Sequence, residues 1–105
     1  MRFLNRRANV EKLVWDDEGD IDYIKSTYEP FDLIIGSDLL YDPCNYPCLL
    51  STVVQFSQKN TITILGGPKR HLERQLLPLA SQRFDVEFKY LDDKNIYLFE
   101  FRHKH

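Results

Sequence analysis

Residues 31–43, which read FDLIIGSDLLYDP, decide the fold class of this chain. The short apolar run at their start, rich in isoleucine and leucine, is typical of a strand buried on both faces in the parallel sheet of an α/β protein. In open α/β sheets, ligands bind beyond the carboxyl ends of the strands. Here that end carries two small residues, Gly36 and Ser37, which let a ligand approach the backbone. Asp38 and Tyr41 follow, and their carboxylate and phenol can face one point, so we expect a site directly after this strand.

The rest of the chain predicts further strands and helices on either side of this segment. Hydrophobic periodicity and turn residues predict strands at 10–15, 31–37, 61–65, 85–91 and 95–102, helices at 46–58 and 69–82, and a short helix or turn at 20–28. Gly66, Gly67 and Pro68 are expected to end the strand 61–65 in a turn. Residues 92–94 are expected to join the last two strands into a hairpin. Because there is no internal repeat or flexible linker, residues 1–105 are predicted to form a single domain.

Composition limits the classes of protein that this chain can belong to. Its 105 residues are 43% hydrophobic and 13% aromatic, which is ample for the core of one small domain. With 14 basic and 16 acidic residues, the net charge of -2 gives no electrostatic reason to expect a nucleic acid or an acidic membrane as the main partner. No run approaches the length of a membrane span and no signal peptide is evident, so the expected location is cytoplasmic.

The segment from Asp32 to Tyr41 resembles strand four of the seven-β-strand S-adenosylmethionine-dependent methyltransferases. The closest resemblance is to the family 16 protein methyltransferases, many of which modify lysine. In that family the strand typically reads Asp, three apolar residues, a small residue, Ser or Thr, and then Asp-x-x-Tyr or Asp-x-x-Phe. Here the last motif is Asp38-Leu39-Leu40-Tyr41, in register at the end of the buried strand.

The resemblance implies a partial Rossmann-like methyltransferase sheet. The predicted order of strands and helices is that of the second half of the family fold, βαβα followed by an antiparallel hairpin. The family's sheet order is 3-2-1-4-5-7-6, and its cofactor loop, an acidic-x-Gly-x-Gly segment after strand one, is not in this sequence. We therefore expect a fold that lacks the N-terminal cofactor-binding strands, and in which the strands 10–15 and 31–37 have lost their neighbours.

The resemblance gives catalytic roles to Asp38 and Tyr41. In a complete enzyme, Asp38 would help to hold the incoming amine, which must be neutral to attack although free lysine has a pKa of about 10.4. The carboxylate and the phenol could accept the departing proton and align nitrogen, methyl and sulfur. Two structural alternatives stay open: Asp38 caps the following helix, and Tyr41 only packs across the end of the sheet.

Trp15 and Ser37 are the candidate cofactor-binding residues. Trp15 matches the family position whose ring lies beside the adenine of S-adenosylmethionine, where stacking buries a flat surface; simple packing is the alternative. Ser37 would contribute backbone contacts to the edge of the cofactor, or would serve only as a small residue in a tight turn. No metal is expected, because Cys44, Cys48 and the scattered histidines lack the spacing of a zinc site.

Two functions follow from the resemblance. The first is an S-adenosylmethionine-dependent methyltransferase that acts on lysine side chains of a protein substrate and is present here as a truncated or partial chain. The second is a non-catalytic methyltransferase-like remnant that acts as an interaction module. In both, the strand 31–37 has an unpaired edge, so we expect either self-association through this edge or a strand 10–15 that folds across it.

Overall fold

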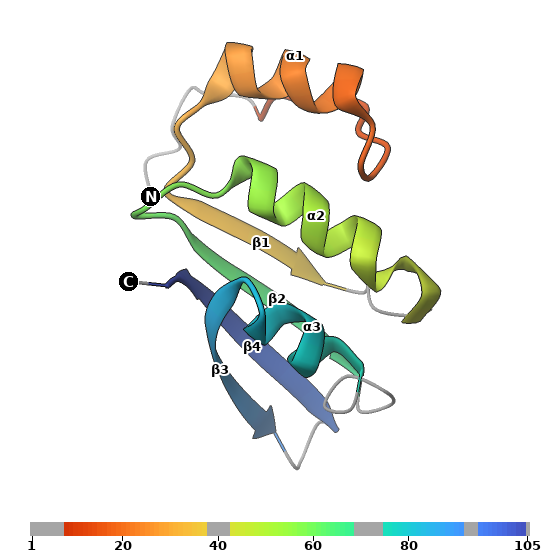
Figure 1. Ribbon diagram of the computed structural model, residues 1–105, viewed down its shortest axis with the longest axis vertical. Helices are drawn as coiled ribbons and strands as arrows, with labels where there is room; N and C mark the ends of the chain where they lie inside the picture. Colours follow the sequence, from red (N-terminus) through yellow and green to blue (C-terminus); the bar gives the residue numbers. More distant parts are fainter. Residues whose placement is uncertain (1–7, 38–42, 69–74, 92–94, 105) are drawn as a thin grey trace, which may run out of the picture.

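The computed structural model describes residues 8–37, 43–68, 75–91 and 95–104 of the chain. Figure 1 shows the elements in chain order. They are α1 (Glu18–Tyr28), β1 (Leu33–Ser37), the short 3-10 helix η1 (Pro43–Asn45), α2 (Tyr46–Phe56), β2 (Ile62–Pro68), α3 (Leu77–Ser81), β3 (Phe84–Leu91) and β4 (Ile96–His103).

The four strands form one mixed sheet in the order β1-β2-β4-β3. β1 and β2 run parallel, with Ile35 opposite Ile64. β4 pairs antiparallel with both β2 and β3. This arrangement confirms a small α/β fold and the C-terminal hairpin, and it leaves β1 and β3 at the two edges of the sheet. The prediction that the strand 31–37 is buried on both faces is wrong, because no described helix covers one face of β1, where Leu33 is 54% exposed and Ile35 is 73% exposed.

The helices begin and end where the sequence provides the necessary chemistry. Asp17 caps α1, because its side chain accepts a hydrogen bond from the backbone N–H of Asp20 at 3.0 Å. The helix ends before Pro30, and Glu29 closes it with a bond to Lys25. Of the helix or turn predicted at 20–28, these observations confirm the helix. The helix predicted at 46–58 is likewise confirmed as α2, which has Pro47 in its first turn.

The core lies between the helices and one face of the sheet. Phe99 and Phe101 of β4 are fully buried, and Phe84 stacks on Phe101 with ring centroids 5.3 Å apart. α2 contributes the apolar residues Leu49, Leu50 and Val53, which follow helical spacing and form one buried stripe. The residues of this core cluster are Tyr46, Leu49, Leu50, Val53, Leu65, Leu76, Ala80, Phe84, Tyr97, Phe99 and Phe101.

The strand predicted at 10–15 is wrong, because this segment has no regular structure. Val10 is 90% exposed and Val14 is 55% exposed. A strand satisfies its backbone groups by pairing with a neighbour, and none of the described strands pairs with this segment. The segment therefore does not cover the edge of β1.

The turn predicted at Gly66-Gly67-Pro68 is also wrong, because β2 continues through these residues. Gly66 lies opposite Leu98, Gly67 opposite Tyr97 and Pro68 opposite Ile96. Pairing with β4 therefore outweighs the usual turn preference of glycine and proline. A Cβ at Gly66 would come within 3.1 Å of Leu98 Cδ2, so the glycine also fits the close packing there.

The helix predicted at 69–82 is confirmed only over α3. Pro78 lies in the first turn of α3, where proline is tolerated because a backbone N–H at this position would have no partner within the helix. Residues 69–74 lie outside the described residues, so the start of the predicted helix stays a prediction.

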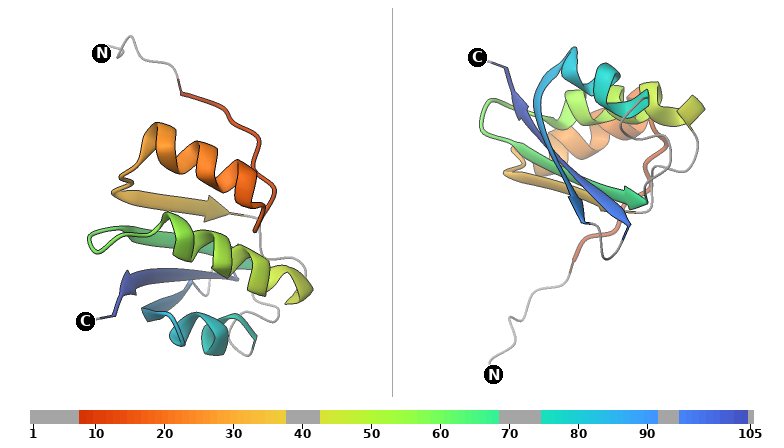
Figure 2. Two further views of the ribbon diagram at one scale, coloured as in Figure 1. Left: turned by 45° about the horizontal axis from the view of Figure 1, so that its top comes forward. Right: turned by 90° about the horizontal axis from the view of Figure 1, so that it is seen from below.

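All three α-helices lie on one face of the sheet. The right-hand view of Figure 2 shows α1, α2 and α3 on the same side of the four strands, while the other side carries no described helix. α1 lies farthest out, past the β1 edge of the sheet (Figure 1).

Candidate functional site

The predicted site follows the carboxyl end of β1. β1 ends at Ser37, and the chain is described again from Pro43, where η1 leads into α2. Asp38 and Tyr41 lie outside the described residues, so their predicted catalytic roles stay predictions. The structure does describe three neighbouring parts of the chain: the end of β1, the start of α2 and the segment around Trp15.

Trp15 is half-buried and packs against the core cluster. Asp16, directly after it, fastens this segment to α2. Its backbone N–H donates to Thr52 Oγ1 at 2.7 Å, and its carboxylate accepts from Ser51 Oγ at 2.8 Å. Asp16 has a φ of 67°, a left-handed conformation that Asp tolerates better than most residues. These contacts fix the position of Trp15 although the segment belongs to no strand.

An open cavity of about 370 Å³ lies beside Trp15. Leu13, Val14 and Trp15 form one side, and Asn45 and Cys48 at the start of α2 form the other. The indole and the two aliphatic side chains provide an apolar surface, and the Asn45 amide can both donate and accept hydrogen bonds. Such a cavity suits the edge of a flat, partly polar group.

Ser37 is exposed at the end of β1, where its Cα partner on β2 is Gly66. It is not among the residues that line the cavity beside Trp15. Within the described residues, the two predicted cofactor-binding residues therefore do not share one cavity. Trp15 keeps an apolar surface that a ligand could use, and Ser37 keeps an exposed backbone at the strand end.

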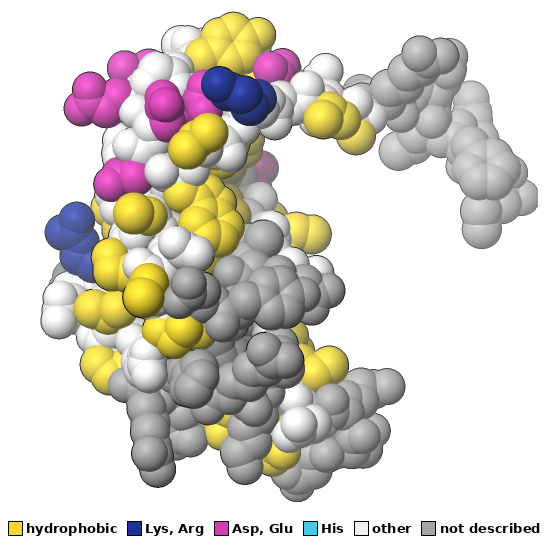
Figure 3. Space-filling view, turned by 90° about the vertical axis from the view of Figure 1, so that its right-hand side faces the viewer, with side chains coloured by type: hydrophobic (Ala, Val, Ile, Leu, Met, Phe, Trp, Pro, Cys, Tyr) yellow, Lys and Arg dark blue, Asp and Glu magenta, His cyan; other side chains and the backbone are white. Residues whose placement is uncertain are grey.

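Acidic side chains gather over α1 on the side of the molecule that faces the viewer in Figure 3, the side toward which β1 points. Two lysines offset part of this charge: Lys12 lies 3.6 Å from Asp20, and Lys25 lies 3.8 Å from Glu29. Both pairs are at the surface, where ion pairs contribute little to stability.

Sequence reasoning missed the contacts that fasten the N-terminal segment. Besides Asp16, the Tyr28 hydroxyl donates to Glu11 Oε1 at 2.7 Å. This hydrogen bond to a carboxylate raises the pKa of Tyr28 to about 12, because the bond requires the protonated phenol. For the Asp16 contacts, the signal in the sequence was the pair Ser51 and Thr52, two hydroxyl residues in the middle of a mostly apolar helix.

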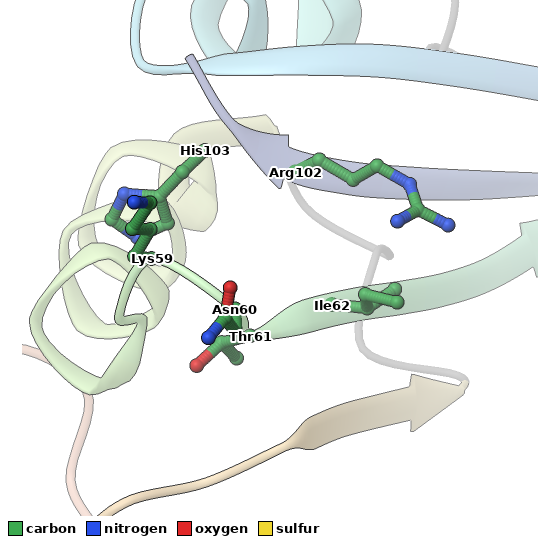
Figure 4. Close-up of a pocket in the computed structure, with 6 residues that line it drawn as sticks. All are labelled: Lys59, Asn60, Thr61, Ile62, Arg102 and His103. Carbon is green, nitrogen blue, oxygen red and sulfur yellow. The ribbon is translucent and has the colours of Figure 1, made fainter. Parts of the chain in front are cut away.

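A second cavity, of about 190 Å³, lies at the opposite end of the sheet, where β2 begins. Figure 4 shows its basic side chains, and the Arg102 guanidinium is directed away from Lys59 and His103. Arg102 instead pairs with Glu100 at 3.1 Å. Since the cationic groups do not converge, this cavity does not define an anion site.

Two other features of the described residues bear on the kind of site. Among them, no group of three or more His, Cys, Asp or Glu side chains is placed to hold a metal ion, and Cys44 and Cys48 are exposed. Over the same parts of the chain, every helix is too short or too polar to cross a bilayer.

Comparison with known proteins defines the family. Residues 1–81 match the lysine methyltransferase family, and the chain belongs to it. It is also similar to the zebrafish (Danio rerio) protein N-lysine methyltransferase METTL21A, with 29% identity over 90 residues. The matched region is 85% of this chain but only 39% of the zebrafish protein, so the chain spans about two fifths of the length of this relative.

Proposed function

We propose that this chain is the substrate-side part of an S-adenosylmethionine-dependent protein-lysine methyltransferase. The observation that carries the proposal is the sheet order β1-β2-β4-β3. With β1 as strand four, it reproduces the segment 4-5-7-6 of the family's sheet, including the parallel first pair and the antiparallel hairpin. In this register the Asp-x-x-Tyr motif leaves the sheet at its carboxyl edge, where α/β enzymes place their chemistry.

Two residues would act on the substrate in this proposal. Asp38 accepts the proton that the lysine amine loses, and Tyr41 holds the amine in line for attack. S-adenosylmethionine, when bound to a complete site, supplies the methyl group. The protein substrate is therefore a chain with an accessible lysine, and we propose neither a nucleic acid nor a membrane as partner.

The described residues fit S-adenosylmethionine only in part. Trp15 and the cavity beside it provide an apolar surface for the adenine, and Asn45 provides a polar group at its rim. Ser37 lies outside that cavity, and no acidic-x-Gly-x-Gly loop occurs in the 105 residues. The cavity beside Trp15 can contact only one side of S-adenosylmethionine. We therefore propose that the 105 residues alone are inactive and function as a partial chain.

The second candidate function is an interaction module. Among the described strands, β1 has a neighbour on one side only, which supports this function because an unpaired strand edge is a template for another chain. In this case the chain is a non-catalytic remnant that pairs with itself or with another protein in the cytoplasm. The two functions differ in whether any completed form of the chain transfers methyl groups.

The test uses a single-chain fusion protein. In it, the part of the zebrafish protein that this chain does not match is joined to the N-terminus of this chain. The fusion is incubated with tritiated S-adenosylmethionine and a cell extract, and the labelled proteins are hydrolysed to amino acids. We expect label in methylated lysine. Label in no amino acid, from a fusion that is folded and binds S-adenosylmethionine, favours the interaction module.

A further inference from the structure

The outer edge of β3 is an open strand edge at the end of the sheet. β3 pairs with β4 on one side, and none of the other described strands lies on its second side (Figure 1). If β1 is strand four of the family's sheet, β3 is strand six, the last in the order 3-2-1-4-5-7-6. Strands one to three of that order lie on the β1 side, so the β3 edge is open in the complete order as well.

Two charged side chains of β3 have no partner in the described part of the chain. Glu87 and Lys89 are exposed, and neither forms an ion pair with another described residue. On β4, Glu87 lies opposite Glu100, which carries the same charge, and Lys89 lies opposite Leu98. Like charges directly opposite each other in a sheet are unfavourable. β3 therefore presents an anion and a cation on one face, and both can pair with another strand.

The helix-covered face of β3 carries an aromatic side chain that α3 leaves uncovered. Phe88 belongs to this face, because its ring centroid lies 5.8 Å from that of the fully buried Phe99. Phe84 is 3% exposed, whereas Phe88 is 43% exposed. α3 ends at Ser81, shortly before β3 begins, so the helix lies at the Phe84 end of the strand. The Phe88 end thus has room for side chains of another strand.

The charge pattern of β3 is complementary to itself in one antiparallel register. When Phe88 lies opposite Phe88 of a second copy, Glu87 of each copy lies opposite Lys89 of the other. A register centred on Glu87 or on Lys89 brings two like charges together at the twofold axis. A register centred on Val86 places Asp85 opposite Glu87, which is also a like-charge pair. Only the register centred on Phe88 forms two ion pairs without a like-charge pair.

The same register suits the apolar side chains and the helices. It places the two Phe88 side chains next to each other at the twofold axis and Val86 opposite Tyr90 of the second copy. Pairs of aromatic and β-branched residues are favourable across strands. Because the strands are antiparallel, the two α3 helices lie at opposite ends of the strand pair, each near its own Phe84. The helices therefore do not compete for space.

We infer that the outer edge of β3 is a docking surface for a second copy of this chain. Residues 85–91 of the two copies pair antiparallel about a twofold axis at Phe88, and the two sheets join into one. A lysine on an edge strand usually protects the edge from pairing. Here Glu87 of the second copy gives Lys89 a partner, so the edge disfavours unrelated strands and accepts its own copy.

The experiment measures the dissociation constant of the full 105-residue chain by sedimentation velocity over a range of concentrations. The contact uses residues 85–91 of each copy, fewer than the roughly 20–30 residues a side of a standard interface, so we expect a reversible dimer with a micromolar dissociation constant. Glu87→Lys and Lys89→Glu each turn two ion pairs into two like-charge pairs and should weaken the dimer by about tenfold or more. The matched control is Lys59→Glu, which makes the same change of charge at an exposed residue outside the strands and should leave the dimer unchanged.

A mixture of the two weakened variants tests the charge pairing itself. In a one-to-one mixture of Glu87→Lys and Lys89→Glu, position 87 of each copy has the opposite charge to position 89 of the other. A heterodimer should therefore form with a dissociation constant within about threefold of that of the unchanged chain. Because unfolded variants cannot form this heterodimer, its presence also shows that both variants are folded.

A cross-link tests the register. In a chain with Cys44→Ser and Cys48→Ser, we expect Phe88→Cys to form a disulfide-linked dimer on mild oxidation. Directly opposite residues have Cα atoms about 4.5–5.5 Å apart, which is within the range of a disulfide. Val86→Cys is the matched control, because its two copies would lie about 14 Å apart and should not cross-link.

Three results would overturn the inference. The first is a chain that stays monomeric up to about 500 μM. The second is a dimer that Ile35→Lys weakens and the two charge reversals do not, since this result places the contact at β1. The third is equal cross-linking of Phe88→Cys and Val86→Cys. None of these measurements depends on methyl transfer, so the inference and the proposed function can fail separately.

Discussion

Thr52→Val should loosen the segment that carries Trp15. Thr52 is 3% exposed, and its Oγ1 accepts from the Asp16 N–H at 2.7 Å while donating to Cys48 O at 2.8 Å. Valine has nearly the same shape, so the change removes the hydroxyl and leaves the Asp16 N–H without this acceptor. A donor without a partner costs about 1–3 kcal/mol when it is buried, and the lower part of this range, about 1–2 kcal/mol, applies here because Asp16 itself is exposed. The added buried methyl group offsets about 0.8 kcal/mol of this.

The net loss of folding free energy should therefore be about 1 kcal/mol or less. In a domain of this size, each kcal/mol lowers the midpoint of thermal unfolding by roughly 4–8 °C. Trp15 is the only tryptophan of the chain, so its fluorescence reports on this segment alone. We expect its emission to shift to longer wavelength as the indole becomes more exposed.

Thr27→Val is the matched control for this substitution. The Thr27 hydroxyl also donates to a backbone carbonyl, Tyr23 O, but it is exposed on α1 and fastens no other segment. It should change the unfolding free energy by less than about 0.5 kcal/mol. If Thr52→Val behaves like this control and leaves the Trp15 emission unchanged, the Asp16 contacts do not position Trp15.

Three further predictions test other parts of the structure. Thr63 is 1% exposed and its Oγ1 has no hydrogen-bond partner among the described residues, so Thr63→Val should be neutral or stabilise the fold by up to about 1 kcal/mol in urea unfolding; a clear destabilisation would reveal a partner. Tyr28, with its pKa raised to about 12, should stay protonated at pH 11 in NMR of labelled tyrosine, whereas in Glu11→Gln it should ionise near its usual pKa of about 10. Because the folded pKa is the higher one, the Tyr28–Glu11 contact is fully present below about pH 10 and is lost as the pH rises through about 12. Isothermal titration of the 105-residue chain with S-adenosylmethionine should show no saturable binding tighter than about 10 μM, or about −7 kcal/mol, and tighter binding would show that most of the site is present.

The fold was predictable wherever a segment carried its own signal. The apolar run of β1, the stripe of α2 and the two alternating strands of the hairpin each specify their structure by pattern, and the structure confirms them. The segment 10–15 also alternates, but no neighbour pairs with it, and a pattern alone does not form a strand. The turn predicted at Gly66-Gly67-Pro68 was wrong for the converse reason, because pairing with β4 outweighs the local turn preference.

The candidate site was predictable in part. The sequence motif places Asp38 and Tyr41 after β1, and the structure confirms the strand that precedes them. The contacts of Asp16 with Ser51 and Thr52 join residues about 35 positions apart, so the local pattern shows the two hydroxyl residues of α2 but not their partner. They depend on how the segment after Trp15 meets α2, which follows from the packed fold.

Methyl transfer by the single-chain fusion, with and without Asp38→Ala, tests the central claim most directly. Asp38 is assigned to the amine of the substrate and not to the cofactor. We therefore predict that Asp38→Ala removes most transfer of label to lysine and leaves the affinity for S-adenosylmethionine in isothermal titration within about twofold. Near-normal turnover in Asp38→Ala would contradict the assignment and would leave Asp38 only the structural role of a helix cap.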